Sequence, residues 1–184
     1  MTRKTAKTHR PRGRSRLLLA IELILLAAII AGGVFMLTRD DAVPSWASQG
    51  NNGARVTIND CVWRVELAID PADRYRGLGG RAALAKDAGM LFVFPEPDVQ
   101  VFCMRDCLFD LDIAFLDADR RVIAIHTMRA EPERAGIATY SSNRPALYAL
   151  EVRSGALAAA GVTLGDQAQF SKDIFRRVKA APLR

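Results

Sequence analysis

The sequence has little cysteine and lacks the short motifs that most directly identify an enzyme. It contains three cysteines among 184 residues, and their spacing matches neither a zinc site nor a thioredoxin-like pair, in which two residues separate the cysteines. It has no glycine-rich phosphate-binding loop and no nucleophile elbow. We also find no internal repeat and no low-complexity tract. These absences argue against the common nucleotide-binding, zinc-binding and serine-hydrolase classes.

The chain has no excess of positive charge once the first 16 residues are set aside. The chain has 26 Lys and Arg against 20 Asp and Glu, a formal net charge of +6 and a pI of about 9.6. Seven of the basic residues lie in residues 1–16, which leaves 19 basic and 20 acidic residues in the remainder. No basic face interleaved with aromatic residues remains, so we predict that the protein has no nucleic-acid partner.

A long apolar run follows the basic arm. Residues 17–37 read LLLAIELILLAAIIAGGVFML, with Glu22 as the one ionisable residue. At about 1.5 Å per helical residue, this run reaches roughly 30 Å, the hydrocarbon thickness of a bilayer. The positive-inside rule keeps the basic arm in the cytoplasm and exports the rest of the chain. The sequence therefore predicts a single-pass signal anchor in the cytoplasmic (inner) membrane.

The remaining boundaries follow from composition. We predict a polar linker over residues 38–53, an extracytoplasmic domain over residues 54–171 and a basic tail over residues 172–184, a solvated and partly frayed end. Ser45, Trp46 and Ala47 form a small-x-small triplet, so cleavage near Ala47 would release a secreted or periplasmic domain. We favour the uncleaved anchor, because cleaved signal peptides usually have an apolar segment of only about 7–15 residues.

Short strands dominate the pattern of the exported domain. We expect strands over residues 55–58, 61–69, 90–94, 100–104, 111–116, 122–128, 147–152 and 167–170. A short helix is expected after Asp70, which is a good N-cap and precedes Pro71, and a second over residues 154–160. The predicted fold class is α+β and β-rich. It is a single small domain of mostly antiparallel strands, in a barrel-like or strongly curved sheet, with one or two short helices and a preceding transmembrane helix.

Several motifs, taken in order, resemble one prokaryotic family. They are RGLGGR (76–81), GMLFVFP (89–95), FCMRDCLFDLDIAFLDADRRVIAIHTM (102–128), TYSS (139–142), PALYALEV (145–152) and GVTLGD (161–166). Over about residues 54–170 the chain resembles the domain of unknown function 192 family. The resemblance implies a small β-rich domain, often exported, with no established activity. Two departures from the family pattern are Gly79, where a methionine is usual, and an altered FWMKNT-PLD segment, which here contains Cys103, Arg105, Asp106, Cys107 and Asp110.

Candidate ligand-binding residues come from these motifs and from the polar residues near them. They are Arg76, Arg81, Met104, Arg105, Asp106, Asp112, His126, Tyr140 and Glu151. Asp112 lies in the apolar strand LDIAFL, where an unpaired charge would cost several kcal/mol, so it needs a cationic or amide partner. We expect Arg76 or Arg105 to be that partner. The sequence assigns no catalytic residue, and we expect neither a cofactor nor a resident metal.

The cysteines raise a separate question. In an oxidising compartment, Cys103 and Cys107 are candidates for a disulfide bond. In a continuous strand their Cα atoms would be about 13 Å apart, beyond the limit of about 7 Å for a bridge, so the bond requires a turn between them. The sequence leaves open whether they form a disulfide or two separate buried thiols. Cys61 is expected to be a small core residue, with pairing to either of the others as the alternative.

Three kinds of function remain open. The leading one is a noncatalytic envelope protein that binds a partner protein or a small-molecule ligand through residues 104–112 and a long loop over residues 129–145. The second is an envelope enzyme of unassigned type, acting with or without a metal, that uses Asp106, Asp112 and His126. The third is a structural or assembly factor for other envelope proteins.

Overall fold

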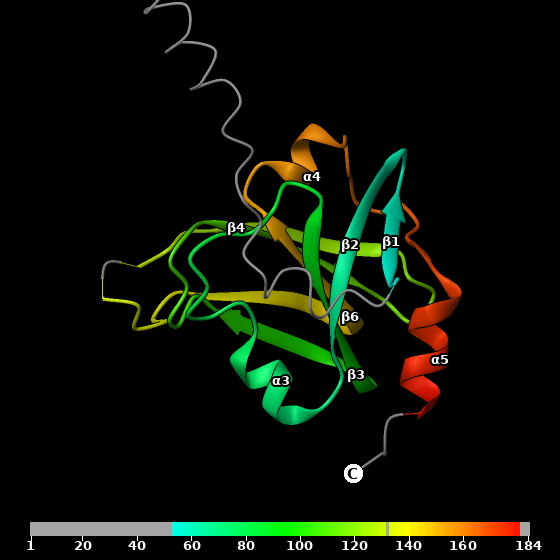
Figure 1. The fold of residues 1–184 in the computed structure, drawn as a ribbon, viewed down its shortest axis with the longest axis horizontal. Coiled ribbons are helices and arrows are strands. Elements are labelled where there is room, and N and C mark those ends of the chain that lie inside the picture. Colours follow the sequence, from blue (N-terminus) through cyan, green and yellow to red (C-terminus); the bar gives the residue numbers. More distant parts are fainter. Residues whose placement is uncertain (1–52, 132, 181–184) are drawn as a thin grey trace, which may run out of the picture. The chain divides into compact units, whose positions relative to one another are not determined.

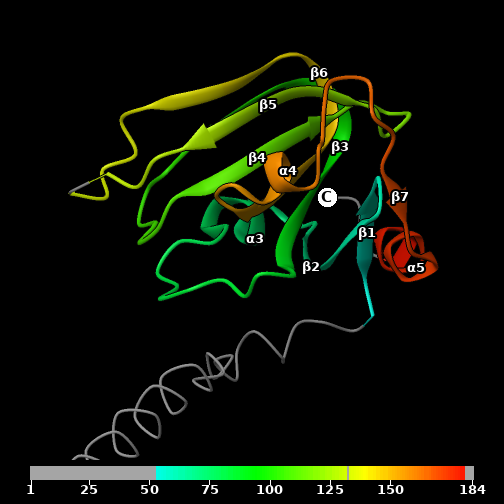
Figure 2. The ribbon, with the colours of Figure 1, turned by 90° about the horizontal axis from the view of Figure 1, so that it is seen from above.

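The protein forms a curled sheet of seven strands. The computed structural model describes residues 53–131 and 133–180, so the predicted anchor and nearly all of the predicted linker lie outside the described residues. Within the described part, no helix is both long and apolar enough to cross a membrane. The strand order is β5-β4-β6-β3-β2-β1-β7, and Figures 1 and 2 show how the sheet curls. The prediction of a β-rich domain with a strongly curved sheet is confirmed.

The first half of the domain begins with a hairpin and a short crossover helix. β1 (Arg55–Ile58) and β2 (Cys61–Ala68) pair antiparallel, and α3 (Pro71–Arg76) follows. The side chain of Asp70 accepts a hydrogen bond from the backbone N–H of Asp73 at 2.9 Å, as expected for an N-cap. The chain then enters β3 beside β2, and these two strands form the one parallel pair among the described strands.

Two long, bent strands form the centre of the sheet. β3 (Ala88–Cys103) and β6 (Thr139–Arg153) pair antiparallel, with register shifts between Val93 and Asp98 and between Val99 and Val101. Such irregularities bend a strand and increase its twist. The first half of β3 lies between β2 and β6, whereas its second half pairs with the beginning of β6 alone.

These long strands differ from the sequence expectation in two places. The separate strands predicted over residues 90–94 and 100–104 are one continuous strand. The loop predicted over residues 129–145 is a loop only as far as residue 138, because residues 139–145 belong to β6. The polar segment SSNRP shows no strand periodicity of its own, and it is extended here because it pairs with the second half of β3.

The other edge of the sheet agrees closely with its prediction. β4 (Leu111–Leu116) and β5 (Val122–Met128) form an antiparallel hairpin, and β4 also pairs with β6. All six residues of β4 are buried, because apolar clusters cover both faces of this strand. Adjacent residues therefore belong to different cores, with Leu116 in one cluster and Phe115 in the other.

The C-terminal segment closes the domain against β1. α4 (Ala156–Ala159) follows β6, and β7 (Gln169–Phe170) pairs antiparallel with β1. Lys172–Ala180 form the helix α5, which lies beside β1 and β7 in both views (Figures 1 and 2). The expectation of a solvated, frayed tail is wrong for these residues, since Ile174 is only 1% exposed and packs in the core.

A candidate ligand site around Glu151

Glu151 is a carboxylic acid placed among apolar side chains. In β6 it pairs with Met90 of β3 and Ile113 of β4, so alternation directs it to the same face of the sheet as these two residues. Glu151 is only 4% exposed, and its Oε2 has no hydrogen-bond partner among the described residues. Most buried polar atoms are hydrogen bonded, so this oxygen calls for an explanation.

The protonation state of Glu151 follows from its surroundings. Burial raises the pKa of Glu151 to about 8, and the guanidinium of Arg81 lowers this pKa by a smaller amount. At pH 7 the carboxyl group is therefore mostly protonated and neutral. In that state it has one O–H donor and still accepts hydrogen bonds.

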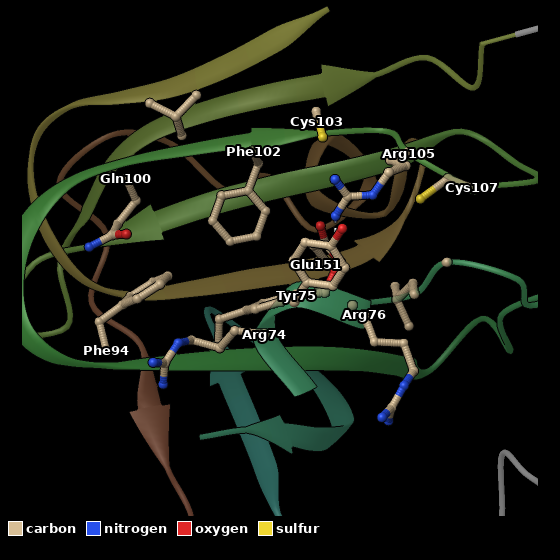
Figure 3. Close-up of a pocket in the computed structure, with 15 residues that line it drawn as sticks. Arg74, Tyr75, Arg76, Phe94, Gln100, Phe102, Cys103, Arg105, Cys107 and Glu151 are labelled. Atoms are coloured by element: carbon tan, nitrogen blue, oxygen red, sulfur yellow. Dashed lines mark hydrogen bonds between the residues drawn. The ribbon is translucent and has the colours of Figure 1, made fainter. Parts of the chain in front are cut away.

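The carboxyl group lies in the wall of a cavity of about 330 Å³ (Figure 3). α3 and the following residues, as far as Gly79, form one side, and both halves of β3 form another. The turn after β3 adds Arg105 and Cys107. Residues from α3, β3 and the turn after β3, all distant in sequence from residue 151, therefore surround one buried acid.

An aromatic wall results from the bend in β3. The rings of Phe92 and Phe102 have centroids 4.8 Å apart, and those of Phe94 and Phe102 are 6.3 Å apart, both in edge-to-face contact. Phe92 precedes the register shifts, Phe94 lies within the first of them, and Phe102 follows both. A straight strand would separate these rings, so the irregularity in the strand builds this wall of the cavity.

Three arginines line the cavity, namely Arg74, Arg76 and Arg105. The guanidinium carbon of Arg105 lies 4.1 Å from the centroid of the Tyr75 ring, and Nη2 donates to the Tyr75 carbonyl at 3.4 Å. Arg74 donates to the carbonyls of Ile69 and Val93, and Arg76 pairs with Asp73 at 3.0 Å. Within the described residues Arg105 has no ion pair, so its charge is available to an anionic group.

The turn after β3 places two thiols at the same cavity. The N–H of Cys107 donates to the Met104 carbonyl at 3.1 Å, and Asp106 adopts a left-handed conformation with φ of 58°. Cys103 and Cys107 both line the cavity and both are free thiols, as is Cys61. Burial, followed by the charges of Glu151, Cys103 and Asp106, raises the pKa of the Cys107 thiol to about 12. The turn that a Cys103 to Cys107 disulfide requires is present.

The loop over residues 129–138 packs against this turn. The N–H of Asp106 donates to the Arg134 carbonyl at 3.0 Å. Gly136 has φ of 68°, and a Cβ atom built on it would lie 2.8 Å from Cβ of Arg105 and 3.0 Å from Sγ of Cys103. Such distances exclude a side chain at this position, so glycine allows the loop to contact the turn.

Asp112 lies on the opposite face of the sheet from Glu151. Its Oδ1 accepts a hydrogen bond from the Thr127 hydroxyl at 2.9 Å, and its Oδ2 accepts one from the Leu157 N–H at 3.2 Å. The prediction that Arg76 or Arg105 pairs with Asp112 is therefore wrong. The amide partner that we considered as the alternative is the one observed. Strand alternation explains the error, because Asp112 pairs with Val152 and not with Glu151.

The residues assigned to a metal-assisted reaction do not share a site. A ring nitrogen of His126 contacts the Ser141 carbonyl at 2.8 Å, and its ring packs against Phe115 and Tyr140. Asp106 lies in the turn after β3, whereas Asp112 is enclosed on the other face. Among the residues that the structure describes, no group of three or more His, Cys, Asp or Glu side chains is arranged to hold a metal.

The other candidates support the domain around the cavity. Arg81 forms two hydrogen bonds to the carboxylate of Glu66, and the one from Nη2 is 2.8 Å long. Met104 is fully buried in the core, and the Tyr140 hydroxyl accepts from the Arg129 N–H at 3.2 Å. Of the nine predicted ligand-site residues, Arg76, Arg105 and Glu151 line the cavity.

Sequence reasoning did not identify the aromatic residues of the site. Phe92 and Phe94 are predicted only as strand residues, and Tyr75 is predicted only as part of a helix. Their alternation in β3 is visible in the sequence and places both phenylalanines on one face. No local signal shows that Phe102 returns to meet them, because the bend depends on pairing with β6.

Comparisons with known proteins agree with this architecture. Residues 54–170 match the family DUF192, described as "Uncharacterized ACR". A crystal structure of a protein of unknown function from Novosphingobium aromaticivorans DSM 12444 is similar, with 34% identity and a TM-score of 0.58; the match covers 62% of this chain and 83% of that one. A protein from Sinorhizobium meliloti 1021, provisionally named a transcription regulator, has 32% identity and a TM-score of 0.57; the match covers 64% of this chain and 91% of that one. No curated protein matches the chain.

Proposed function

Because the chain belongs to the DUF192 family of uncharacterised proteins, in which no activity is established, we propose a function from the cavity itself. The protein is a membrane-anchored envelope protein whose extracytoplasmic domain binds a small molecule at Glu151 without catalysing a reaction. The observation that carries this proposal is the unpartnered Oε2 of a buried carboxyl group in a cavity wall. An unsatisfied buried polar atom costs about 1–3 kcal/mol, and a ligand that hydrogen bonds to it would remove this penalty.

The lining indicates the chemistry of the ligand. A volume of about 330 Å³ is at the lower end of the range for ligand pockets, which favours a small molecule. Phe92, Phe94 and Phe102 favour a flat apolar body. Glu151 favours a hydrogen-bond donor on the ligand, and Arg105 favours an anionic group. We therefore assign the ligand to the class of small aromatic acids that carry an N–H or O–H donor.

Two probes of similar size test this assignment. Indole-3-acetate has an aromatic body, a carboxylate and a ring N–H, whereas 1-naphthaleneacetate has no N–H. Calorimetry with the detergent-solubilised full chain should show at least about five-fold tighter binding of the indole, because one hydrogen bond contributes roughly 1 kcal/mol. Glu151→Met keeps the length of the side chain and should abolish this preference.

A matched variant controls for the change of charge. Glu96 is exposed on β3, so Glu96→Gln should leave the preference for the indole unchanged. Failure of both probes to bind, or the same preference in Glu151→Met as in the wild type, would overturn the proposal.

The membrane anchor is supported by the sequence of residues 1–37, in which seven basic residues precede an apolar run of bilayer length. Fusions at the C-terminus of the full chain test the orientation. Alkaline phosphatase should be active and green fluorescent protein should be dark when each is fused after Arg184. A fusion that fluoresces only in the cytosol would show that the domain is not exported.

A further inference from the structure

The two thiols beside the cavity lie at the two ends of a tight turn. The hydrogen bond from the Cys107 N–H to the Met104 carbonyl closes a turn of four residues. Such a turn brings the Cα atoms of its first and fourth residues within about 7 Å, whereas the same residues in a strand would be about 10 Å apart. Cys103 directly precedes the turn. The chain reversal therefore brings Cys103 and Cys107 closer together than a continuous strand would, as a disulfide between them requires.

The surroundings of the two thiols differ in a way that suggests an order of reaction. Cys103 is half-buried and lines the cavity, so a small molecule that enters the cavity can reach it. Cys107 is buried in the apolar cluster and its raised pKa keeps the thiol protonated, which makes it a poor first nucleophile. This asymmetry is that of an attacking thiol and a resolving thiol.

We infer that Cys103 and Cys107 form a redox-active pair, which exchanges with small disulfides and closes to an intramolecular disulfide on the wall of the Glu151 cavity. In the first step, the thiolate of Cys103 attacks one sulfur of the small disulfide, and the other sulfur leaves as a thiolate. In the second step, the thiolate of Cys107 attacks the sulfur of Cys103 and expels the second small thiolate. The two protons lost by the cysteines end on the two departing thiols. Two electrons pass from the cysteines to the small disulfide.

The activity goes beyond the proposed ligand binding and does not depend on it. Its consequence for the site is local, because Arg105 lies between the two cysteines. Closure would restrain the turn that carries this guanidinium and would remove the thiol of Cys107 from the cavity.

Oxidised glutathione is the probe for the test. The reduced full chain is incubated with it at pH 8, quenched in acid, alkylated and digested with trypsin. Because trypsin cleaves after Arg105, the disulfide should appear as two peptides joined through Cys103 and Cys107, while Cys61 remains alkylated. The equilibrium constant for closure should be at least ten-fold higher in the native chain than in urea, because the fold holds the turn in place.

Single variants test the order of the steps. Cys107→Ser should accumulate a mixed disulfide between Cys103 and glutathione, Cys103→Ser should leave Cys107 unmodified, and Cys61→Ser should close as the wild type does. An equal or lower closure constant in the native chain than in urea would overturn the proposal. Preferential modification of Cys107 in Cys103→Ser would overturn the assigned roles. Neither measurement uses the aromatic probes, so failure here is distinct from failure of the ligand site.

Discussion

Raising the pH should destabilise this domain, because Glu151 must lose its proton at a position where burial disfavours the charged form. The pKa of Glu151 is about 8 in the folded protein and has its ordinary value of 4.5 when the chain unfolds. Between these values the folded state keeps a proton that the unfolded state releases. The contribution of Glu151 to the free energy of unfolding is therefore complete below pH 4.5 and is lost as the pH rises through 8.

The size of the effect follows from the same two values. Each pH unit within this window changes the free energy of unfolding by about 1.4 kcal/mol for one proton. From pH 5.5 to pH 7.5 the wild type should therefore lose roughly 3 kcal/mol from this group alone. Glu151→Gln has a similar shape and no ionisation, so its stability should lack this slope. The variant should be the more stable protein at pH 7.5.

Urea unfolding of the detergent-solubilised full chain would measure this difference. Trp63 is buried and reports on the core, and Trp46→Phe removes the second tryptophan of the chain. Other titrating groups cancel when each variant is compared with the wild type at the same pH, and Glu96→Gln makes the same chemical change at an exposed position. If the wild type and Glu151→Gln have the same pH dependence to within about 1 kcal/mol, the carboxyl group is not held neutral by burial, and our description of the cavity is wrong.

Three further substitutions test the packing around the site. Asp112→Ala should lower the free energy of unfolding by roughly 3 kcal/mol, because it leaves the Thr127 hydroxyl and the Leu157 N–H without their acceptor. A change below about 1 kcal/mol would contradict these contacts. Gly89→Ala should destabilise the domain by about 2 kcal/mol or more in the same urea assay, since its Cβ would lie 2.6 Å from the Glu151 carbonyl oxygen. An unchanged urea midpoint would show that β3 and β6 can move apart here without a loss of stability. Gly136→Ala should displace the loop from the turn and increase hydrogen exchange of the Asp106 amide, and unchanged exchange would show that this contact is not needed.

The elements that follow local rules were predictable. β4 and β5 have the predicted bounds, since apolar residues and the intervening acidic turn are contiguous in the sequence. α3 begins after its predicted cap, because Asp70 and Pro71 act within one turn of helix. The beginning of β6 and the whole of α5 were not predicted, because each depends on residues far away in the chain. Residues 139–145 need the second half of β3 as a partner, and α5 needs a core in which Ile174 can be buried.

The candidate site shows the same division. Arg76, Arg105 and Glu151 could be selected from the sequence, because they lie in motifs that the chain shares with its family. The way these three residues lie relative to one another could not be predicted from the sequence, and neither could the partners of Asp112. Adjacent residues of a strand face opposite sides of a sheet, so residues 112 and 113 belong to different environments, which only the strand pairing identifies.

The sequence by itself determined the family, the β-rich class of the domain, the β4–β5 hairpin and the capped helix α3, because these depend on residue type and on contacts between neighbours in the chain. Only the tertiary structure decided that Glu151 is a buried acid with an unpartnered oxygen, and that it shares a cavity with three phenylalanines, Arg105 and two thiols. The cause is the register shift in β3, which brings Phe102 back to Phe92, and no periodicity in the sequence records such a long-range pairing.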